Sequence, residues 1–373
     1  MQKIINGIAK LPAILSKVGC KRLYLVVDSS YPYLSIKDAI ESLPAKEMVL
    51  FSGFTPNPLY EQVCDGIELL KSSKCDTILA VGGGSALDVA KCIKLAILSN
   101  EGNAAIIPPQ VTKQLPIDGT RLPFIAIPTT AGTGSESTHN AVMYYKGAKQ
   151  TVTNDGILPN YAILEPSVLK TLPIYQKKCT LMDALCQGIE SWWSINSTEE
   201  SHDYSRKTIE LIIANWKRYI INNDDVAASH VMMAANYGGR AINIAQTTAA
   251  HAFSYKITSL YNLPHGHAVA VCLPVIWEYM LGNMDKCIDS RGKDYLLRVF
   301  YDISRAMGCD DPKRAIALFR KMMNDMELNC PTAIRREEDL QVLSTSVNPV
   351  RLKNNPIAID PITAKALYST IVL

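Results

Sequence analysis

Four side chains in the second half of the chain have the donor atoms of a divalent metal site. Asp183 and Gln187 are four residues apart, which places a carboxylate and an amide oxygen on one face of a helix. His251 follows a long helical pattern, and His265 comes fourteen residues later. Two imidazoles and a carboxylate suit a divalent ion such as Fe²⁺ or Zn²⁺. The alternative is an exposed carboxylate near a helix start and two loop histidines, because Gln is a poor first-choice ligand.

A glycine-rich turn in the first half has the features of a phosphate-binding loop. Gly82-Gly83-Gly84-Ser85 follows an apolar run at 77–81 and precedes helical spacing at 86–98. Glycine lets the backbone approach a ligand closely, and a helix N-terminus offers free N–H groups to a pyrophosphate. The segment is not a GxGxxG fingerprint and lacks the Lys-Ser/Thr of a P-loop. The alternative is a tight turn that needs glycine only for its geometry.

Two further features favour a nucleotide cleft beside that turn. The segment 129–136 (TTAGTGSE) is rich in glycine and hydroxyl groups and follows another apolar run. Loops at neighbouring strand ends form one cleft at the carboxyl edge of a parallel sheet. Asp28 ends the first apolar run, where a carboxylate would bind a ribose 2′-OH and repel a 2′-phosphate. A cap on the next helix is the commoner role for such an Asp.

The elements that must position these residues follow an α/β rhythm in the first half. Helical spacing at 36–43, 59–72 and 86–98 alternates with short apolar runs at 23–27, 48–51, 77–81 and 123–127. Strands that alternate with helices predict an open parallel sheet. We therefore expect an α/β dinucleotide-binding domain at 1–172.

The second half has a different periodicity. Apolar residues recur every three or four positions at 178–194, 201–222, 226–260, 266–281, 294–307 and 312–326. This spacing predicts helices, and strand-like alternation is scarce. We therefore expect an all-helical metal- and substrate-binding domain at 173–373.

Composition restricts the possible classes of protein. A chain of 373 residues with 48% hydrophobic and 20% charged residues is globular and suggests about two domains. A net charge of +3 gives no reason to expect a nucleic-acid or membrane partner. The sequence shows neither a membrane-length apolar run nor a secretory signal. Ten cysteines without a CxxC pair fit reduced thiols, so we expect a cytoplasmic protein.

The motifs together resemble the iron-containing (group III) alcohol dehydrogenase family over nearly the whole chain. The resemblance is carried by the order and spacing of TPNP at 55–58, GGGS at 82–85 with Asp88, IPTTAGT at 127–133, DAL at 183–185 with IE at 189–190, and PHG at 264–266. It implies an α/β nucleotide-binding domain, a helical domain, and a metal and nicotinamide that meet in the cleft between them. Dehydroquinate synthases share this architecture.

The resemblance also implies individual site residues. Contacts with NAD(H), preferred over NADP(H), are expected at Asp28, Asn57, Gly83, Gly84, Ser85, Asp88, Thr129, Thr130, Thr133 and Lys149. One divalent metal, Fe²⁺ or Zn²⁺, is expected at Asp183, Gln187, His251 and His265. Typical members have His at position 187, so Gln187 predicts weaker metal binding. They also have His at position 255, where this chain has Tyr255, which changes the expected proton pathway.

The local sequence further resembles one subgroup of the family. The segments DALCQGIESWWS at 183–194 and PHGHAVA at 264–270 are similar to those of enzymes that reduce phosphonoacetaldehyde to 2-hydroxyethylphosphonate. The implied reaction is reversible hydride transfer between NAD(H) and a small aldehyde or alcohol, with Tyr255 or His267 as proton relay.

A phosphonate group needs cationic or N–H donors, for which His267, Arg206 and Arg240 are candidates. Arg240 precedes His251 by eleven residues, which predicts a shared helical face at a separation of about 16 Å. A salt bridge at the surface or between domains is an equally good explanation for Arg240.

Two other functions stay open at this point. A dehydroquinate synthase-like lyase would use the same metal and NAD, but its polyhydroxylated substrate needs more Lys, Arg and Asn groups than 183–267 contains. A metal-free nucleotide-binding protein would explain Gln187. Asp183, His251 and His265 argue against that alternative, because three protein ligands suffice for a catalytic metal. We expect the protein to form a homodimer.

Overall fold

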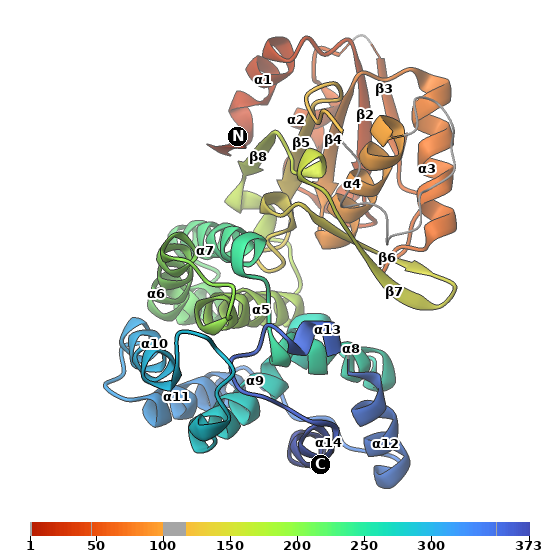
Figure 1. Ribbon diagram of the computed structural model, residues 1–373. Coiled ribbons are helices and arrows are strands. Elements are labelled where there is room, and N and C mark those ends of the chain that lie inside the picture. Colours follow the sequence, from red (N-terminus) through yellow and green to blue (C-terminus); the bar gives the residue numbers. More distant parts are fainter. Residues whose placement is uncertain (1, 46, 100–116, 348) are drawn as a thin grey trace. The chain divides into compact units, whose positions relative to one another are not determined.

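The computed structural model describes residues 2–45, 47–99, 117–347 and 349–373. The chain divides into two compact units, Met1–Leu172 and Pro173–Leu373. The first is an α/β unit and the second is helical, which confirms the predicted fold class (Figure 1). In the described part of the chain, no helix has both the length and the apolar character needed to cross a membrane.

A parallel sheet forms the centre of the first unit. Its strands are β1 (Lys3–Asn6), β2 (Arg22–Val27), β3 (Glu47–Phe51), β4 (Thr77–Gly82), β5 (Phe124–Pro128) and β8 (Tyr161–Leu164). They lie in the order β1-β8-β5-β4-β2-β3, and each neighbouring pair is parallel. Strands β4, β5 and β8 are buried at every position, as expected for a sheet covered on both faces. The four predicted strands are therefore confirmed, and β1 and β8 are additional.

The helices of this unit are α1 (Leu11–Lys17), α2 (Lys37–Glu41), α3 (Tyr60–Ser73) and α4 (Gly84–Ser99). Helices α3 and α4 pack against strands of the sheet. Apolar side chains of α3 and α4, such as Ile67 and Ile93, join strand residues such as Phe124 in one core cluster. An antiparallel hairpin, β6 (Asn140–Tyr145) and β7 (Ala148–Thr153), packs against α4 and was not predicted.

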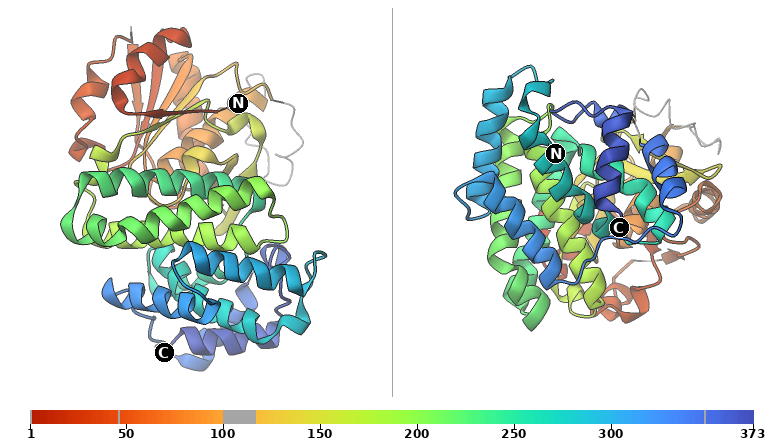
Figure 2. Two further views of the ribbon diagram at one scale, coloured as in Figure 1. Left: turned by 90° about the vertical axis from the view of Figure 1, so that its left-hand side faces the viewer. Right: turned by 90° about the horizontal axis from the view of Figure 1, so that it is seen from below.

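The second unit consists of helices in the described residues. Their bounds are α5 (Ile174–Trp193), α6 (Glu199–Asn222), α7 (Asp225–Ala245), α8 (Ala249–Tyr261), α9 (His265–Gly282), α10 (Lys293–Ala306), α11 (Pro312–Asp325), α12 (Arg336–Ser346), α13 (Pro349–Leu352) and α14 (Pro361–Ile371). Helix α5 is central, because it packs against α6, α7, α9 and α10 (Figure 2).

The predicted helical stretch 226–260 is two helices, and this prediction of one continuous element is wrong. Helix α7 ends at Ala245, and Gln246 has a left-handed φ of 61° that turns the chain before α8 begins at Ala249. The intervening Gln-Thr-Thr contains neither Gly nor Pro, so the sequence gives no strong signal for the break.

Candidate metal and nucleotide sites

Three helices bring Asp183, His251 and His265 together. Asp183 lies in the middle of α5, His251 in the first turn of α8, and His265 is the first residue of α9. One ligand atom from each residue lies within 4.8 Å of the others, and His251 Nε2 is 3.4 Å from Asp183 Oδ1. Asp183 and His251 are buried, and His265 is half-buried. A buried carboxylate beside two imidazoles has the chemistry of a divalent metal site, so the residues fit the expected ion.

Gly266 permits the close approach of α9 to α5. A Cβ atom at this position would lie 2.0 Å from the Cys179 carbonyl oxygen and 2.9 Å from the Asp183 Cβ. Any side chain would therefore push the start of α9 away from α5. Glycine at 266 is needed to keep His265 beside Asp183.

Gln187 lies one turn after Asp183 on α5 and is buried. Its Oε1 atom points toward Gly238 of α7, where an added Cβ would come within 3.3 Å of it. The small residue on α7 thus makes room for the amide. The role of Gln187 as a metal ligand stays a prediction.

His251 is held by a carboxylate that the sequence interpretation gave no role. Its Nδ1 atom bonds to Oε2 of Glu190, which is also buried on α5. Burial lowers the pKa of His251, but the Glu190 and Asp183 carboxylates raise it more, to about 10. Glu190 could have been found from its spacing, because it follows Asp183 by seven residues and therefore shares its helical face.

The two candidate proton relays have different surroundings. The Tyr255 ring stacks on His265 with ring centroids 5.9 Å apart, so it lies beside the predicted metal ligands. His267 is buried, and each of its nitrogens is 2.8 Å from a partner: Nδ1 from the Tyr175 hydroxyl and Nε2 from the Asn329 carbonyl. Burial also lowers the pKa of His267, which favours a neutral ring. This geometry favours Tyr255, although the roles of both residues stay predictions.

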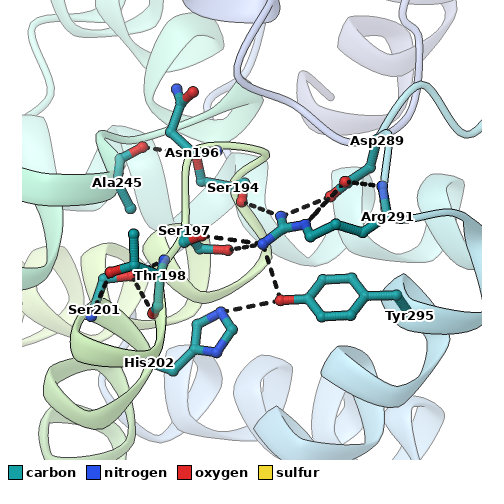
Figure 3. A network of polar contacts seen from close by, with 10 residues as sticks. All are labelled: Ser194, Asn196, Ser197, Thr198, Ser201, His202, Ala245, Asp289, Arg291 and Tyr295. Atoms are coloured by element: carbon teal, nitrogen blue, oxygen red, sulfur yellow. Dashed lines mark hydrogen bonds and ion pairs between the residues drawn. The ribbon is translucent and has the colours of Figure 1, made fainter.

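Arg206 is directed away from the cluster. Its guanidinium lies 5.6 Å from the centre of the Trp192 ring. Trp192 follows Asp183 by nine residues, which is about 13 Å along α5. Arg206 instead lines a pocket of about 340 Å³ together with His202 and Tyr295. Figure 3 shows the polar network that holds Tyr295 and His202 there.

Arg240 does not share a helical face with His251, contrary to the prediction, because the two residues belong to different helices. Its guanidinium lies 5.4 Å from the centre of the Tyr204 ring on α6. Gly238, two residues earlier, faces α5, and residues two apart on a helix point about 200° apart. Arg240 therefore points away from the helix that carries Asp183.

In the α/β unit, the predicted glycine turn connects β4 to α4. The Gly83 carbonyl accepts hydrogen bonds from the N–H groups of Ala86 and Leu87. The N–H groups of the two residues directly after Gly83 are therefore the ones that a ligand can reach in the first helical turn. Thr130 and Thr133 flank the turn, because their side chains lie 3.6 Å and 3.0 Å from positions that Cβ atoms on Gly83 and Gly84 would take. The half-buried turn thus has backbone donors of the kind that bind a pyrophosphate.

Asp28 supports this turn directly. Its Oδ2 atom accepts a 2.7 Å hydrogen bond from the Gly83 N–H, and Oδ1 accepts one of 2.9 Å from the Ser30 N–H. A Cβ on Gly82 would lie 2.5 Å from Asp28 Oδ2, which explains glycine at that position. Asp28 does not cap the next α-helix, because Ile36 precedes α2 and provides no side-chain cap. The carboxylate thus stays at the carboxyl edge of the sheet, as its proposed contact with ribose requires.

Two of the remaining predicted nucleotide contacts, Asn57 and Thr129, lie at the same glycine turn. The Asn57 N–H donates to the Ser85 hydroxyl at 3.3 Å, and the Thr129 N–H donates to the Gly82 carbonyl at 3.0 Å. Lys149 lies on β7, paired with Tyr144 of β6. These contacts bring the loop at 55–58 and the segment at 129–136 to the glycine turn.

Asp88 and Lys91 tie the nucleotide loops to α4. Asp88 accepts from the Ser135 hydroxyl at 2.7 Å and from the Val142 N–H at 3.0 Å. Loss of water raises the pKa of Asp88, against the effect of Lys91. Both Asp88 oxygens therefore bond within the protein, and a contact between Asp88 and the cofactor stays a prediction.

The sequence interpretation missed Lys91, which is fully buried. Its Nζ lies 2.6 Å from the Ser135 carbonyl, 3.0 Å from the Thr138 hydroxyl and 2.8 Å from the Asn140 carbonyl. Burial lowers the pKa of Lys91 to about 8. The available signal was its spacing, because Lys91 follows Asp88 by three residues and therefore lies on the same helix face.

Comparison with known proteins finds one family whose models match both halves of the chain. Residues 3–166 match the family model described as iron-containing alcohol dehydrogenase, and residues 178–372 match the C-terminal model of the same family. The phosphonoacetaldehyde reductase of Streptomyces viridochromogenes is 33% identical over 335 residues, which cover 85% of this chain and 82% of that protein. The NAD-dependent methanol dehydrogenase of Bacillus methanolicus is 28% identical over 273 residues, 72% of this chain and 70% of that protein.

The matches extend over most of each chain. Alignments with three other curated relatives cover 66% to 69% of the relative's length. A crystal structure of 1,3-propanediol oxidoreductase superposes with a TM-score of 0.86 and 25% identity, covering 99% of this chain and 97% of that one. The chain therefore belongs to the iron-containing alcohol dehydrogenase family of oxidoreductases.

Proposed function

We propose that the protein is a metal-dependent dehydrogenase that interconverts a small aldehyde and its alcohol with NAD(H). The observation that carries the proposal is the convergence of Asp183, His251 and His265 within 4.8 Å. Two imidazoles and one carboxylate leave coordination positions open, as a catalytic rather than a structural metal site does. The matching models are alcohol dehydrogenase models, which favours this reaction over the dehydroquinate synthase-like lyase and the non-enzymatic alternative.

The protein residues would hold, orient and protonate the reactants. A divalent ion held by Asp183, His251 and His265, with Gln187 as a weaker donor, would polarise the carbonyl oxygen as a Lewis acid. Hydride transfer is the chemistry that the nicotinamide supplies. Tyr255, stacked on His265, is our candidate to pass a proton at its hydroxyl to the developing alkoxide.

The cofactor that we propose is NAD(H) in preference to NADP(H). The glycine turn offers N–H groups to the pyrophosphate, and Asp28 fixes that turn while keeping a carboxylate at the carboxyl edge of the sheet. A carboxylate there would repel a 2′-phosphate. The NAD-dependent methanol dehydrogenase among the relatives supports the same choice.

The substrate that we propose is phosphonoacetaldehyde, reduced to 2-hydroxyethylphosphonate. Its support is the relative of that name at 33% identity and the similar segments at 183–194 and 264–270. The guanidinium groups of Arg206 and Arg240 lie over aromatic rings of other helices. Neither residue therefore supports a pocket for the phosphonate group. A cytoplasmic homodimer remains our proposal for the assembly and its location.

A comparison of aldehydes after metal loading tests the proposal. Purified protein is analysed for metal, loaded with Fe²⁺ or Zn²⁺, and assayed for NADH consumption. We expect kcat/KM for phosphonoacetaldehyde to exceed that for propionaldehyde or lactaldehyde by at least tenfold, about 1.4 kcal/mol of transition-state discrimination. Equal efficiency would reject the phosphonate substrate but keep the dehydrogenase. Full activity in chelator-treated, metal-free protein would reject the metal-dependent mechanism.

A further inference from the structure

Glu190 is a buried carboxylate with a dense set of hydrogen bonds. It lies on α5 on the same face as Asp183, with no exposed surface. Its Oε1 atom accepts bonds from the Thr248 N–H at 3.0 Å, the Thr248 hydroxyl at 2.9 Å, the Ala250 N–H at 3.1 Å and the His251 N–H at 3.3 Å. Its Oε2 atom bonds to His251 Nδ1. The two oxygens therefore have separate tasks.

We infer that Glu190 is a positioning residue that selects the metal-binding nitrogen of His251. When Nδ1–H donates to Glu190, Nε2 is the only ring nitrogen left to bind a metal ion. Nε2 is the atom that lies 3.4 Å from Asp183 Oδ1. The carboxylate thus fixes both the tautomer and the orientation of the ring. This inference rests on the metal site of the proposed function.

A carboxylate is required because every group that faces Glu190 in these contacts is a donor. A carboxylate accepts at both oxygens, whereas the Gln amide has one acceptor oxygen and one NH₂ donor. If the Gln oxygen kept the contacts at the start of α8, its NH₂ would face Nδ1–H of His251. His251 would then have to move its proton to Nε2, the nitrogen that must bind the metal. If the amide were reversed, its NH₂ would face the N–H groups of α8 instead.

The Oε1 contacts have a different function, because they cap α8. A negative charge at a helix N-terminus stabilises the helix through its unpaired N–H groups and its dipole. Thr248 extends the network, since its hydroxyl also accepts a 2.8 Å bond from Trp193 Nε1. Thr248 therefore supports the cap without touching the Oε2–His251 bond, and a variant at Thr248 separates the two functions.

The test compares metal affinity in Glu190→Gln and Thr248→Val. The affinity of each intact protein for Zn²⁺ is measured by competition with a chelator, in the absence of aldehyde and NADH. We expect Glu190→Gln to weaken Zn²⁺ binding by about 10- to 100-fold, the usual effect of losing such a partner. Thr248→Val should stay within about threefold of wild type. Both variants should lower the unfolding temperature of the metal-free protein, because Thr248→Val loses the hydroxyl contacts of the cap and Glu190→Gln loses its negative charge.

Two results would overturn the inference. One is Zn²⁺ affinity in Glu190→Gln within threefold of wild type. The other is an equal loss in Thr248→Val, which would mean that the cap, and not the bond to His251, controls affinity. The proposed function is tested separately. If the wild-type protein binds Zn²⁺ but reduces no aldehyde, the proposed dehydrogenase activity is wrong, whereas the inferred role of Glu190 is kept. A wild-type protein that binds no divalent metal would overturn both.

Discussion

Replacement of Gly266 by Ala should separate the metal ligands. The added methyl carbon would lie 2.0 Å from the Cys179 carbonyl oxygen and 2.8 Å from its carbonyl carbon. Contact between carbon and a carbonyl oxygen is roughly 3.3–3.6 Å, so the start of α9 must move by about 1 Å or more. Overpacking of this kind costs about 1–3 kcal/mol. His265 precedes the substituted residue, so the shift would move this ligand away from Asp183.

The expected losses can be measured separately. A misplacement of about 1 Å costs about 100-fold in rate, so kcat/KM for the aldehyde should fall by about that factor. Zn²⁺ affinity should fall as well, and the unfolding temperature should decrease. Gly282→Ala is the matched control, because it lies at the other end of α9 and an added Cβ meets nothing within 4 Å. If Gly266→Ala binds Zn²⁺ and turns over like Gly282→Ala, the close helix approach does not position the site.

Three further predictions address the cofactor, the fourth ligand and a buried lysine. Asp28→Ala should narrow the preference for NADH over NADPH, measured as the ratio of kcat/KM, because a repulsive charge is lost. Gln187→His should tighten Zn²⁺ binding by about tenfold, or 1.4 kcal/mol, in chelator competition. Lys91 has its pKa lowered to about 8, so below that pH the folded protein must bury a charge that the unfolded chain keeps in water. The unfolding free energy of wild type, relative to Lys91→Met, should therefore rise between pH 8 and pH 10.5 in urea denaturation.

Each of these predictions has a result that would contradict it. An unchanged cofactor ratio in Asp28→Ala would leave Asp28 with only its role in holding Gly83. Unchanged Zn²⁺ affinity in Gln187→His would mean that position 187 does not reach the metal. A stability difference for Lys91→Met that stays flat or falls with pH would show that Lys91 does not lose its proton on folding in this range.

Five of the six helical stretches predicted for the second unit agree with the structure. Helices α5, α6, α9, α10 and α11 begin and end within a few residues of the predicted stretches. Strands β1 and β8 have four residues each, too few for periodicity to identify them. The break between α7 and α8 depends on a left-handed Gln246, and local sequence rarely reveals such a residue.

The site residues were easier to predict than their roles. Motif spacing identified Asp183, His251 and His265, because ligand types are visible in the sequence. Which partner a polar group binds depends on tertiary contacts. The role of Glu190 as the partner of His251 therefore depends on how α8 packs against α5, although its spacing from Asp183 is visible in the sequence. Arg240 was likewise a plausible anion donor until its aromatic partner on α6 was known.

The convergence of three proposed ligands also implies how the second unit would respond to loss of a bound metal. Asp183, His251 and His265 belong to three different helices, so an ion bound to them would act as a cross-link. That cross-link would close a loop of about 80 residues, and the entropy of closing such a loop grows with its length. Since an ion that binds only the folded state stabilises it by mass action, free metal concentration would set resistance to heat and proteolysis. Depletion of metal would thus shorten the lifetime of the protein and also lower its activity.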